Sequence, residues 1–317
     1  MMTEGLRARL QTHLPIAVLI ALILIVGLYD RTFFSLANFL SVTADTMTLF
    51  LMASGVTLVI MIGGIDLSIQ AVASMASCIL AVYLPRYGFF AVPLAVLGGA
   101  IAGLMGGMVS TRLRIPSFIA TLAVSGLVIT AAYWFSETRS VNIPGELSDA
   151  YLGWAVGETL GVPREILVGL ACLAVLSAIL ALTPFGRLVR AIGSQERAVI
   201  ASGIDADRTK VMAYALSGTM AAIAGVVMAA RLGSGSPILA NEFLLPAIAC
   251  IVVGGTAITG GVGSVWRTFI GALIVQVVRI GMTFMGVSVF AQQIVFGFIL
   301  VAAVAITMDR AKISVIK

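Results

Sequence analysis

Long apolar runs that carry almost no charge dominate this chain and leave few folds open to it. A transmembrane helix needs about 20 mostly apolar residues to cross about 30 Å of hydrocarbon. About ten segments approach or reach that length, and none alternates between polar and apolar residues as a β-barrel strand would. We therefore predict helices at approximately 14–29, 36–62, 67–84, 89–110, 116–135, 165–183, 208–230, 243–258, 265–284 and 288–308.

The composition supports a membrane environment for these helices. Of the 317 residues, 60% are hydrophobic and 10% are charged, whereas soluble domains are roughly 45–50% apolar and about 25% charged. A soluble globule of this length could not supply enough polar residues for its surface. We predict an all-α membrane protein, a polytopic bundle of about ten transmembrane helices that forms one transmembrane domain over residues 1–317.

The basic residues indicate how the bundle is oriented. With the N-terminus in the cytoplasm, most of the 19 Lys and Arg residues, including every lysine, fall at cytoplasmic ends and loops, as the positive-inside rule requires. About ten spans then place both termini in the cytoplasm. The net charge of +5 follows from these loops, which form no continuous basic face. We therefore expect membrane lipid, and not nucleic acid, as a partner.

The reactive side chains argue against catalysis. The one histidine, His13, precedes the first span, so no Ser-His pair can form within the membrane. The cysteines Cys78, Cys172 and Cys250 lie in apolar runs and lack metal-ligand spacing. The sequence contains no phosphate-binding loop of the P-loop type. We expect this chain to be no enzyme, to hold no cofactor and to have no ATPase site of its own.

The stretches LVIMIGGIDLS (58–68) and ACIVVGGTAIT (249–259) indicate a weak internal repeat. In transporters, glycine-interrupted spans at matching positions of two halves indicate the transport route. For Asp66 the alternative is structural, since its carboxylate could cap the N-terminus of the next span. The candidate residues for the route or its gate in these stretches are Gly63, Gly64, Asp66, Ser68, Gly254, Gly255 and Thr256.

Asp45 is the second carboxylate expected within the membrane, about ten residues and roughly 15 Å into its span. A carboxylate at this depth is costly, so Asp45 is a candidate for the translocation path. The alternatives are a hydrogen bond with Thr43 or Thr46, or burial at a subunit contact. Arg279 is the expected counter-charge, unless it snorkels to the outer surface. Gln293, at the start of the last span, is a further candidate for the path near the outer mouth.

Two connecting segments are long. The inner one, 184–207, has apolar residues at helical spacing and predicts two short helices on the membrane surface, broken at Gly193 and Gly203. It is either a basic connector or a docking surface for a cytoplasmic partner, and its length and accessible charges favour docking. The outer segment, 136–164, is polar and predicts a folded loop with a short amphipathic helix near 151–156.

Several stretches together carry a family resemblance: GVTLVIMIGGIDLS (55–68), IPSFIATL (115–122), FGRLVRAIGSQERAVIASGI (185–204), ARLGSGSP (230–237) and AIACIVVGGTAITGGVGSVWRTFIGALI (247–274). Through them nearly the whole chain closely resembles the permease subunits of ribose-type sugar importers of the ATP-binding-cassette (ABC) class. The resemblance implies a subunit of the bacterial inner membrane that forms the translocation path for a monosaccharide or related polyol.

The same resemblance implies three protein partners. A periplasmic binding protein would deliver the sugar, a separate ATPase subunit would drive transport, and a second permease copy or a paralogue would complete a dimer. In that family the inner loop is the coupling segment that docks on the ATPase. The resemblance assigns this role to Arg190, Gly193, Glu196, Arg197 and Gly203.

Other functions remain open at this point. An ion-coupled secondary transporter would need essential charges within the membrane and no ATPase; the few buried carboxylates and the long inner loop argue against it. An ABC permease for branched-chain amino acids or nucleosides is a second alternative, and the GGIDLS stretch favours the sugar branch over it. A membrane scaffold without transport activity is a third.

Overall fold

The computed structural model describes residues 4–307, and the side chains of residues 14–302 within them. The helices are α1 (Glu4–Tyr29), α2 (Leu36–Met61), α3 (Ile69–Tyr87), α4 (Ala91–Arg112), α5 (Ser117–Ser136), α6 (Gly145–Tyr151), α7 (Arg164–Leu182), α8 (Pro184–Ala201), α9 (Ala206–Leu232), α10 (Leu244–Val253), α11 (Val265–Phe284) and α12 (Val289–Thr307). The short strands are β1 (Val141–Asn142), β2 (Glu158–Thr159), β3 (Val162–Pro163) and β4 (Ser234–Gly235), and the 3-10 turns are η1 (Arg31–Phe34), η2 (Gly88–Phe90) and η3 (Asn241–Phe243).

Within the described chain, six segments are long and apolar enough to cross a membrane, and one of them, residues 69–112, contains both α3 and α4. Shorter apolar helices form at 14–29, 241–253 and 289–302. Each predicted span thus contains a helix, and the prediction of an all-α membrane protein is confirmed. The number of helices that cross the membrane and the side on which the termini lie stay predictions. The basic residues Arg310, Lys312 and Lys317 lie outside the described residues.

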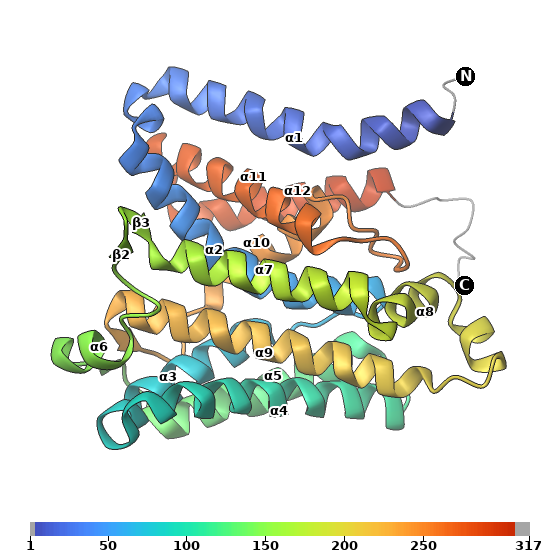
Figure 1. The fold of residues 1–317 in the computed structure, drawn as a ribbon, viewed down its shortest axis with the longest axis horizontal. Helices are drawn as coiled ribbons and strands as arrows, with labels where there is room; N and C mark the ends of the chain where they lie inside the picture. Colours follow the sequence, from blue (N-terminus) through green and yellow to red (C-terminus); the bar gives the residue numbers. More distant parts are fainter. Residues whose placement is uncertain (1–3, 308–317) are drawn as a thin grey trace.

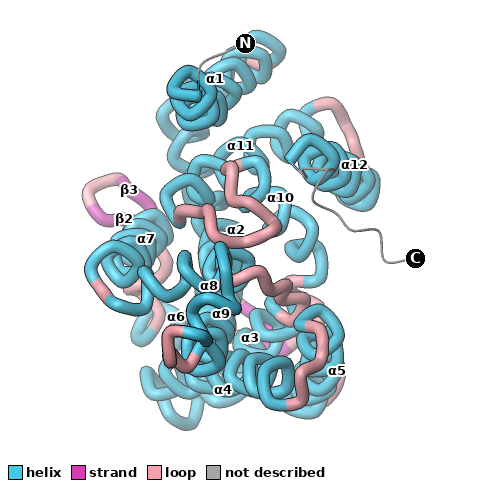
Figure 2. Tube along the Cα trace, turned by 90° about the vertical axis from the view of Figure 1, so that its right-hand side faces the viewer, coloured by secondary structure: helices cyan, strands magenta, loops and turns pink. Residues whose placement is uncertain are grey.

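Helix α2 forms the centre of the bundle (Figure 2). It is buried on every side from Thr46 to Met61 and packs against α7, α9, α10 and α11. Its sequence is apolar around the whole circumference, which is typical of a helix surrounded by other helices. Ser35 begins it, because the Ser35 hydroxyl accepts a hydrogen bond from the Asn38 N–H at 3.2 Å. The core of the protein therefore surrounds α2. The two ends of α2 contribute to the sites described below.

The two ends of the bundle differ (Figure 1). One end carries α6 and the hairpin of β2 and β3, while α8 lies at the other end. Strand β1 pairs with β4, which ties the loop after α5 to the end of α9. We refer to the α6 end as outer and the α8 end as inner, following the topology predicted from the charges.

The predicted helix of the outer loop is misplaced by several residues. The structure forms α6 at Gly145–Tyr151 and turns at 152–157, where the sequence predicts the helix. Glu146 lies in the first turn of α6, where a carboxylate interacts favourably with the positive end of the helix dipole. The spacing of apolar residues alone indicated the wrong segment, because the prediction did not consider the favourable interaction of Glu146 with the helix dipole.

Candidate functional site

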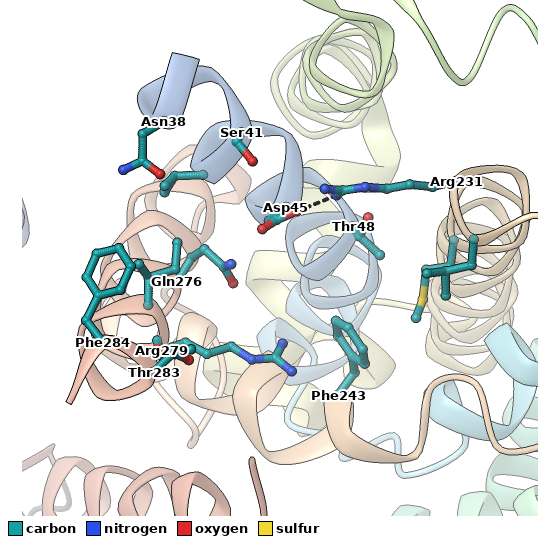
Figure 3. Close-up of a pocket in the computed structure, with 14 residues that line it drawn as sticks. Asn38, Ser41, Asp45, Thr48, Arg231, Phe243, Gln276, Arg279, Thr283 and Phe284 are labelled. Atoms are coloured by element: carbon teal, nitrogen blue, oxygen red, sulfur yellow. Dashed lines mark hydrogen bonds and ion pairs between the residues drawn. The ribbon is translucent and has the colours of Figure 1, made fainter. Parts of the chain in front are cut away.

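A polar pocket opens in the outer half of the bundle, between α2, the end of α9, η3 and α11 (Figure 3). Its volume is about 540 Å³. The wall is mixed, with aromatic and aliphatic side chains beside several polar ones. The polar lining residues are Asn38, Ser41, Asp45, Thr48, Arg231, Gln276, Arg279 and Thr283. We call this the outer pocket.

Asp45 forms an ion pair across the outer pocket with Arg231, near the end of α9 (Figure 3). The Asp45 side chain is 35% exposed and that of Arg231 is 37% exposed, so both charges can meet a ligand or water within the pocket. The sequence analysis expected a different partner. The hydroxyls of Thr43 and Thr46 instead donate to carbonyl oxygens one turn earlier in α2, at 2.8 and 2.7 Å.

Arg279 lines the same pocket but is not the direct partner of Asp45. Its guanidinium lies over the ring of Phe243, 5.2 Å from the ring centroid. A guanidinium in this position is held by the electron-rich ring face. Arg231 therefore makes the direct ion pair with Asp45, and Arg279 is a second positive group in the outer pocket whose charge also interacts with Asp45.

Gln293 does not line the outer pocket. Its side-chain amide donates to the carboxylate of Glu242 at 2.6 Å and to the Glu242 carbonyl oxygen at 3.0 Å. These two bonds tie α12 to η3, next to Phe243. Gln293 thus affects the pocket indirectly, by holding in place the segment that contains Phe243.

Both glycine pairs end their helices in the same way. After α2, the N–H of Gly63 donates to Ile60 and that of Gly64 to Val59, both at 2.9 Å. After α10, the N–H of Gly255 donates to Val252 at 2.9 Å, and that of Thr256 to Ile251 at 3.1 Å. Gly63 and Gly255 have φ values of +80° and +86°, which favour glycine.

This geometry shifts the register of the internal repeat by one residue. The sequence match aligned Gly63 with Gly254, whereas the structure makes Gly63 equivalent to Gly255 and Gly64 equivalent to Thr256. The two repeats align at the residue that has a left-handed backbone conformation. Because each sequence has two adjacent glycines, the sequence alone does not indicate which glycine adopts it. Gly254 is the residue before the turn and has an ordinary helical backbone.

Asp66 is 1% exposed and holds the segment after Gly64 in place. Its carboxylate accepts hydrogen bonds from the N–H of Ser68 at 2.9 Å, the hydroxyl of Ser68 at 2.6 Å and the hydroxyl of Ser217 at 2.7 Å. Ser68 is the residue before α3, so Asp66 binds the N-cap residue itself. Asp66 thus accepts a free N–H at the start of α3, as expected for a cap, and it also joins the break after α2 to α9.

We expect Asp66→Asn to lower the free energy of unfolding by about 2 kcal/mol, because hydrogen bonds to a charged group each contribute about 1.5–3 kcal/mol. The loss should appear as a lower Tm of the purified protein in detergent. The matched control is Asp149→Asn, which changes an exposed carboxylate of α6. Equal Tm values for the wild type and Asp66→Asn would contradict this account of the break.

At the inner end, α8 contacts both helix breaks at one point. The N–H of Gly261 donates to the carbonyl oxygen of Met61 at 2.9 Å, which joins the loop after α10 to the end of α2. A Cβ atom on Gly193 of α8 would lie 1.8 Å from that Met61 oxygen and 2.3 Å from the Gly261 nitrogen. We call Met61, Gly193 and Gly261 the inner junction.

Helix α8 contains the two short helices predicted, but the break between them lies at Gln195, two residues after Gly193. It runs from Pro184 to Ala201 with one kink at Gln195, whose φ and ψ are −159° and 78°. Gly193 keeps a helical conformation. Its lack of a side chain lets α8 lie close to the backbone of Met61 and Gly261. Gly203, with φ +79°, ends the helix as predicted, through a hydrogen bond from its N–H to the Ile200 carbonyl oxygen at 2.9 Å.

The charged residues of α8 have separate surroundings. Glu196 forms an ion pair with Lys210 of α9. Arg190 donates to the carbonyl oxygens of Leu180 and Gly186 at 3.1 and 3.3 Å, which fastens α8 to the end of α7. Arg197 is exposed. The structure thus brings Gly193 to the inner junction and leaves Glu196 and Arg197 partly or fully accessible at the inner end.

Sequence reasoning missed Arg231, Gln276 and Gly261. Arg231 carried a usable signal, since an arginine on the outer side runs against the positive-inside rule and indicates a specific partner. Gln276 and Gly261 carried no such signal, because their roles depend on contacts between distant segments. Among the side chains described, those of residues 14–302, no group of three or more His, Cys, Asp or Glu is placed to hold a metal ion.

Comparison with known proteins relates this architecture to transporters. Residues 38–304 match the family described as the branched-chain amino acid transport system permease component. The ribose import permease protein of Haemophilus influenzae is 34% identical over 90% of this chain and 90% of its own length. That of Escherichia coli is 33% identical over 95% and 94%. The L-arabinose transport system permease protein of Escherichia coli is 34% identical over 83% of this chain and 79% of its own length.

These matches cover most of the chain and of each relative. They confirm the resemblance to ribose-type permeases and the predicted function as the permease subunit of an ABC importer. Such a subunit is not itself an enzyme. The chain belongs to the branched-chain amino acid transport system permease family, and it is similar to ribose and L-arabinose permeases.

Proposed function

We propose that this chain forms the sugar path of an importer in the bacterial inner membrane. A periplasmic binding protein delivers a monosaccharide or related polyol to the outer end, and a separate ATPase subunit acts on the inner end. Its similarity to ribose and L-arabinose permeases supports a sugar as cargo.

The outer pocket is the observation that carries this proposal. Sugars offer hydroxyl groups that both donate and accept, and Asp45, Asn38, Gln276 and the two arginines supply acceptors and donors within one cavity of about 540 Å³. The ring of Phe243 supplies an apolar surface for the carbon face of a sugar. A path must also release its cargo, and a pocket that is open on one side suits weak binding.

We further propose one domain over residues 1–317, with about ten spans and both termini in the cytoplasm. Figure 1 draws the beginning of α1 and the end of α12 toward the inner end, where α8 lies, which supports termini on one side. Several large apolar side chains, such as Leu127, Trp134 and Phe298, are 62, 75 and 72% exposed. Lipid and a second permease copy or paralogue would cover them.

The glycine breaks complete the proposed route at the inner end. Gly63, Gly64, Asp66, Ser68, Gly254, Gly255 and Thr256 lie in two loops that meet beneath α8 through the Met61–Gly261 hydrogen bond. We propose that these loops gate the path and that α8 docks on the ATPase. The docking residues are Arg190, Gly193, Glu196, Arg197 and Gly203.

Uptake into proteoliposomes tests the proposed function. The chain is reconstituted with its ATPase and binding protein, and accumulation of radiolabelled ribose and L-arabinose is measured with and without ATP. We expect ATP-dependent accumulation of at least one sugar or polyol. Accumulation driven by an ion gradient without ATPase would instead support a secondary transporter.

The family description itself favours one alternative cargo, branched-chain amino acids. Leucine and isoleucine therefore belong in the same uptake experiment. Accumulation of either amino acid without that of any sugar would replace the proposed cargo while leaving the ABC permease function intact.

The docking surface gives a separate prediction. We expect Glu196→Lys to prevent co-purification of the ATPase, because it reverses a partly exposed charge on α8 and breaks the pair with Lys210. The double variant Glu196→Lys, Lys210→Glu restores an ion pair within the chain but not the original surface. We expect this variant to remain without ATPase. Restored co-purification would mean that Glu196 acts only by holding α8 to α9.

A further inference from the structure

A second cavity lies beside the outer pocket, toward the outer end. Its volume is about 670 Å³, and it is bounded by the first turns of α2, the β2–β3 hairpin and the start of α7. We call it the vestibule. Ala37 of α2, Glu158 of β2 and Glu165 of α7 belong to its lining. Neither the sequence analysis nor the comparisons assign it a role.

Glu165 is the unusual residue of the vestibule. It is 7% exposed, and its Oε2 atom has no hydrogen-bond partner among the described residues. Buried carboxylate oxygens are normally hydrogen-bonded, and an unsatisfied one carries a desolvation penalty. Its place in the first turn of α7 offsets part of that penalty through the helix dipole but supplies no donor to Oε2. Glu165 thus belongs to the wall of the vestibule and has one buried carboxylate oxygen that lacks a donor.

The vestibule and the outer pocket share part of their walls. Ser41 and Arg231 line both cavities. Arg231 is held by Asp45 on the outer-pocket side, so its charge is already neutralised there. Glu165 and Asp45 therefore line adjacent cavities that have Ser41 and Arg231 in common.

We propose that the vestibule is a second sugar subsite, at which hydroxyl groups of an uncharged sugar donate to the Glu165 carboxylate before the sugar passes Arg231 into the outer pocket. The inference rests on the proposed function. The chemistry selects neutral polyhydroxylated ligands, because Glu158 and Glu165 both repel an anionic sugar while the carboxylate of Glu165 accepts from hydroxyls.

Adjacent residues of α2 allow the two cavities to be probed separately. Ala37 lines the vestibule only, and Asn38 lines the outer pocket only. Ala37→Cys and Asn38→Cys are each introduced with Cys172→Ser, since Cys172 is the partly exposed native cysteine while Cys78 and Cys250 are buried. The assembled permease–ATPase complex in detergent is treated with a small maleimide, and the labelling rate is measured with increasing ribose or L-arabinose. Glycine betaine at equal osmolality is the solute control.

We expect sugar to slow labelling at both positions. Adding Glu165→Ala should raise the sugar concentration that protects Ala37→Cys about tenfold or more, since a hydrogen bond to a charged group is lost, and should leave protection of Asn38→Cys unchanged. Glu165→Gln, which keeps the shape and one acceptor oxygen, should give an intermediate shift. Glu146→Ala is the matched control, because Glu146 is an exposed carboxylate in the first turn of another outer helix, α6.

The outcomes separate the two proposals. Protection at Asn38→Cys without protection at Ala37→Cys overturns the subsite and leaves the sugar path standing. Unchanged protection at Ala37→Cys in Glu165→Ala also overturns the subsite. No protection at either position, together with no sugar uptake by the wild type, overturns the proposed function and the subsite with it. Normal protection of Asn38→Cys in the Glu165 variants shows that they are folded.

Discussion

Gly193→Ala is expected to abolish uptake and to detach the ATPase, although it adds a single methyl group. The new Cβ atom would lie 1.8 Å from the Met61 oxygen and 2.3 Å from the Gly261 nitrogen, far inside van der Waals contact. Both neighbours are backbone atoms, one at the end of α2 and one in the loop after α10, so no side-chain rotation relieves the clash. Overpacking of this kind costs about 1–3 kcal/mol or more, and here it separates α8 from both breaks.

Three measurements on Gly193→Ala follow: Tm in detergent, co-purification of the ATPase, and uptake in proteoliposomes. The matched control is Gly126→Ala in α5, where an added Cβ meets no atom within 4 Å. This control should keep its uptake, and its Tm should stay equal or rise, because alanine favours a helix over glycine by about 1 kcal/mol. Wild-type Tm and uptake in Gly193→Ala would refute the inner junction.

Asp45→Leu is expected to reduce uptake at least tenfold while the ATPase still co-purifies. The change leaves Arg231 without its counter-charge in the outer pocket and removes an acceptor for sugar hydroxyls. Breaking a fully buried pair costs about 3–5 kcal/mol, but both side chains are about a third exposed. We therefore expect a modest stability loss, about 1–2 kcal/mol, and a larger effect on transport.

The double variant Asp45→Asn, Arg231→Gln distinguishes stability from transport. It removes both charges together, so no unpaired charge remains and Tm should return toward the wild-type value. If Asp45 lines the path, uptake should remain low despite the recovered Tm. Recovery of both Tm and uptake would show that the ion pair is only structural and that sugar passes elsewhere.

Local patterns predicted the helices well and their contacts poorly. The spans follow from apolar length alone, which is why each predicted segment contains a helix. Glycine at Gly203 was correctly placed at a helix end, because left-handed backbone there is a local requirement. The break predicted at Gly193 lies two residues later, at Gln195. The close approach of Gly193 to Met61 and Gly261 was not predicted, since it depends on segments far away in the sequence.

The candidate site shows the same division between local and distant information. Asp45 was recognised from its depth in an apolar run, but its partner Arg231 comes from a helix end almost two hundred residues later, and the charge bias had assigned that end to an outer loop. Asp66 was correctly expected beside Ser68, and the bond to Ser217 of α9 could not be read from spacing. Partners on the same turn are visible in a sequence, whereas partners on another helix are not.

The inner junction has a mechanical consequence. Closely packed protein interiors are stiff, so a displacement of one backbone atom directly displaces the backbone atoms in contact with it. Gly193 lies against a carbonyl oxygen at the end of α2 and an amide nitrogen in the loop after α10, so a displacement of α8 moves both segments together. If these loops gate the path as proposed, both gates open in one step, and an intermediate with only one of them displaced requires that this contact breaks.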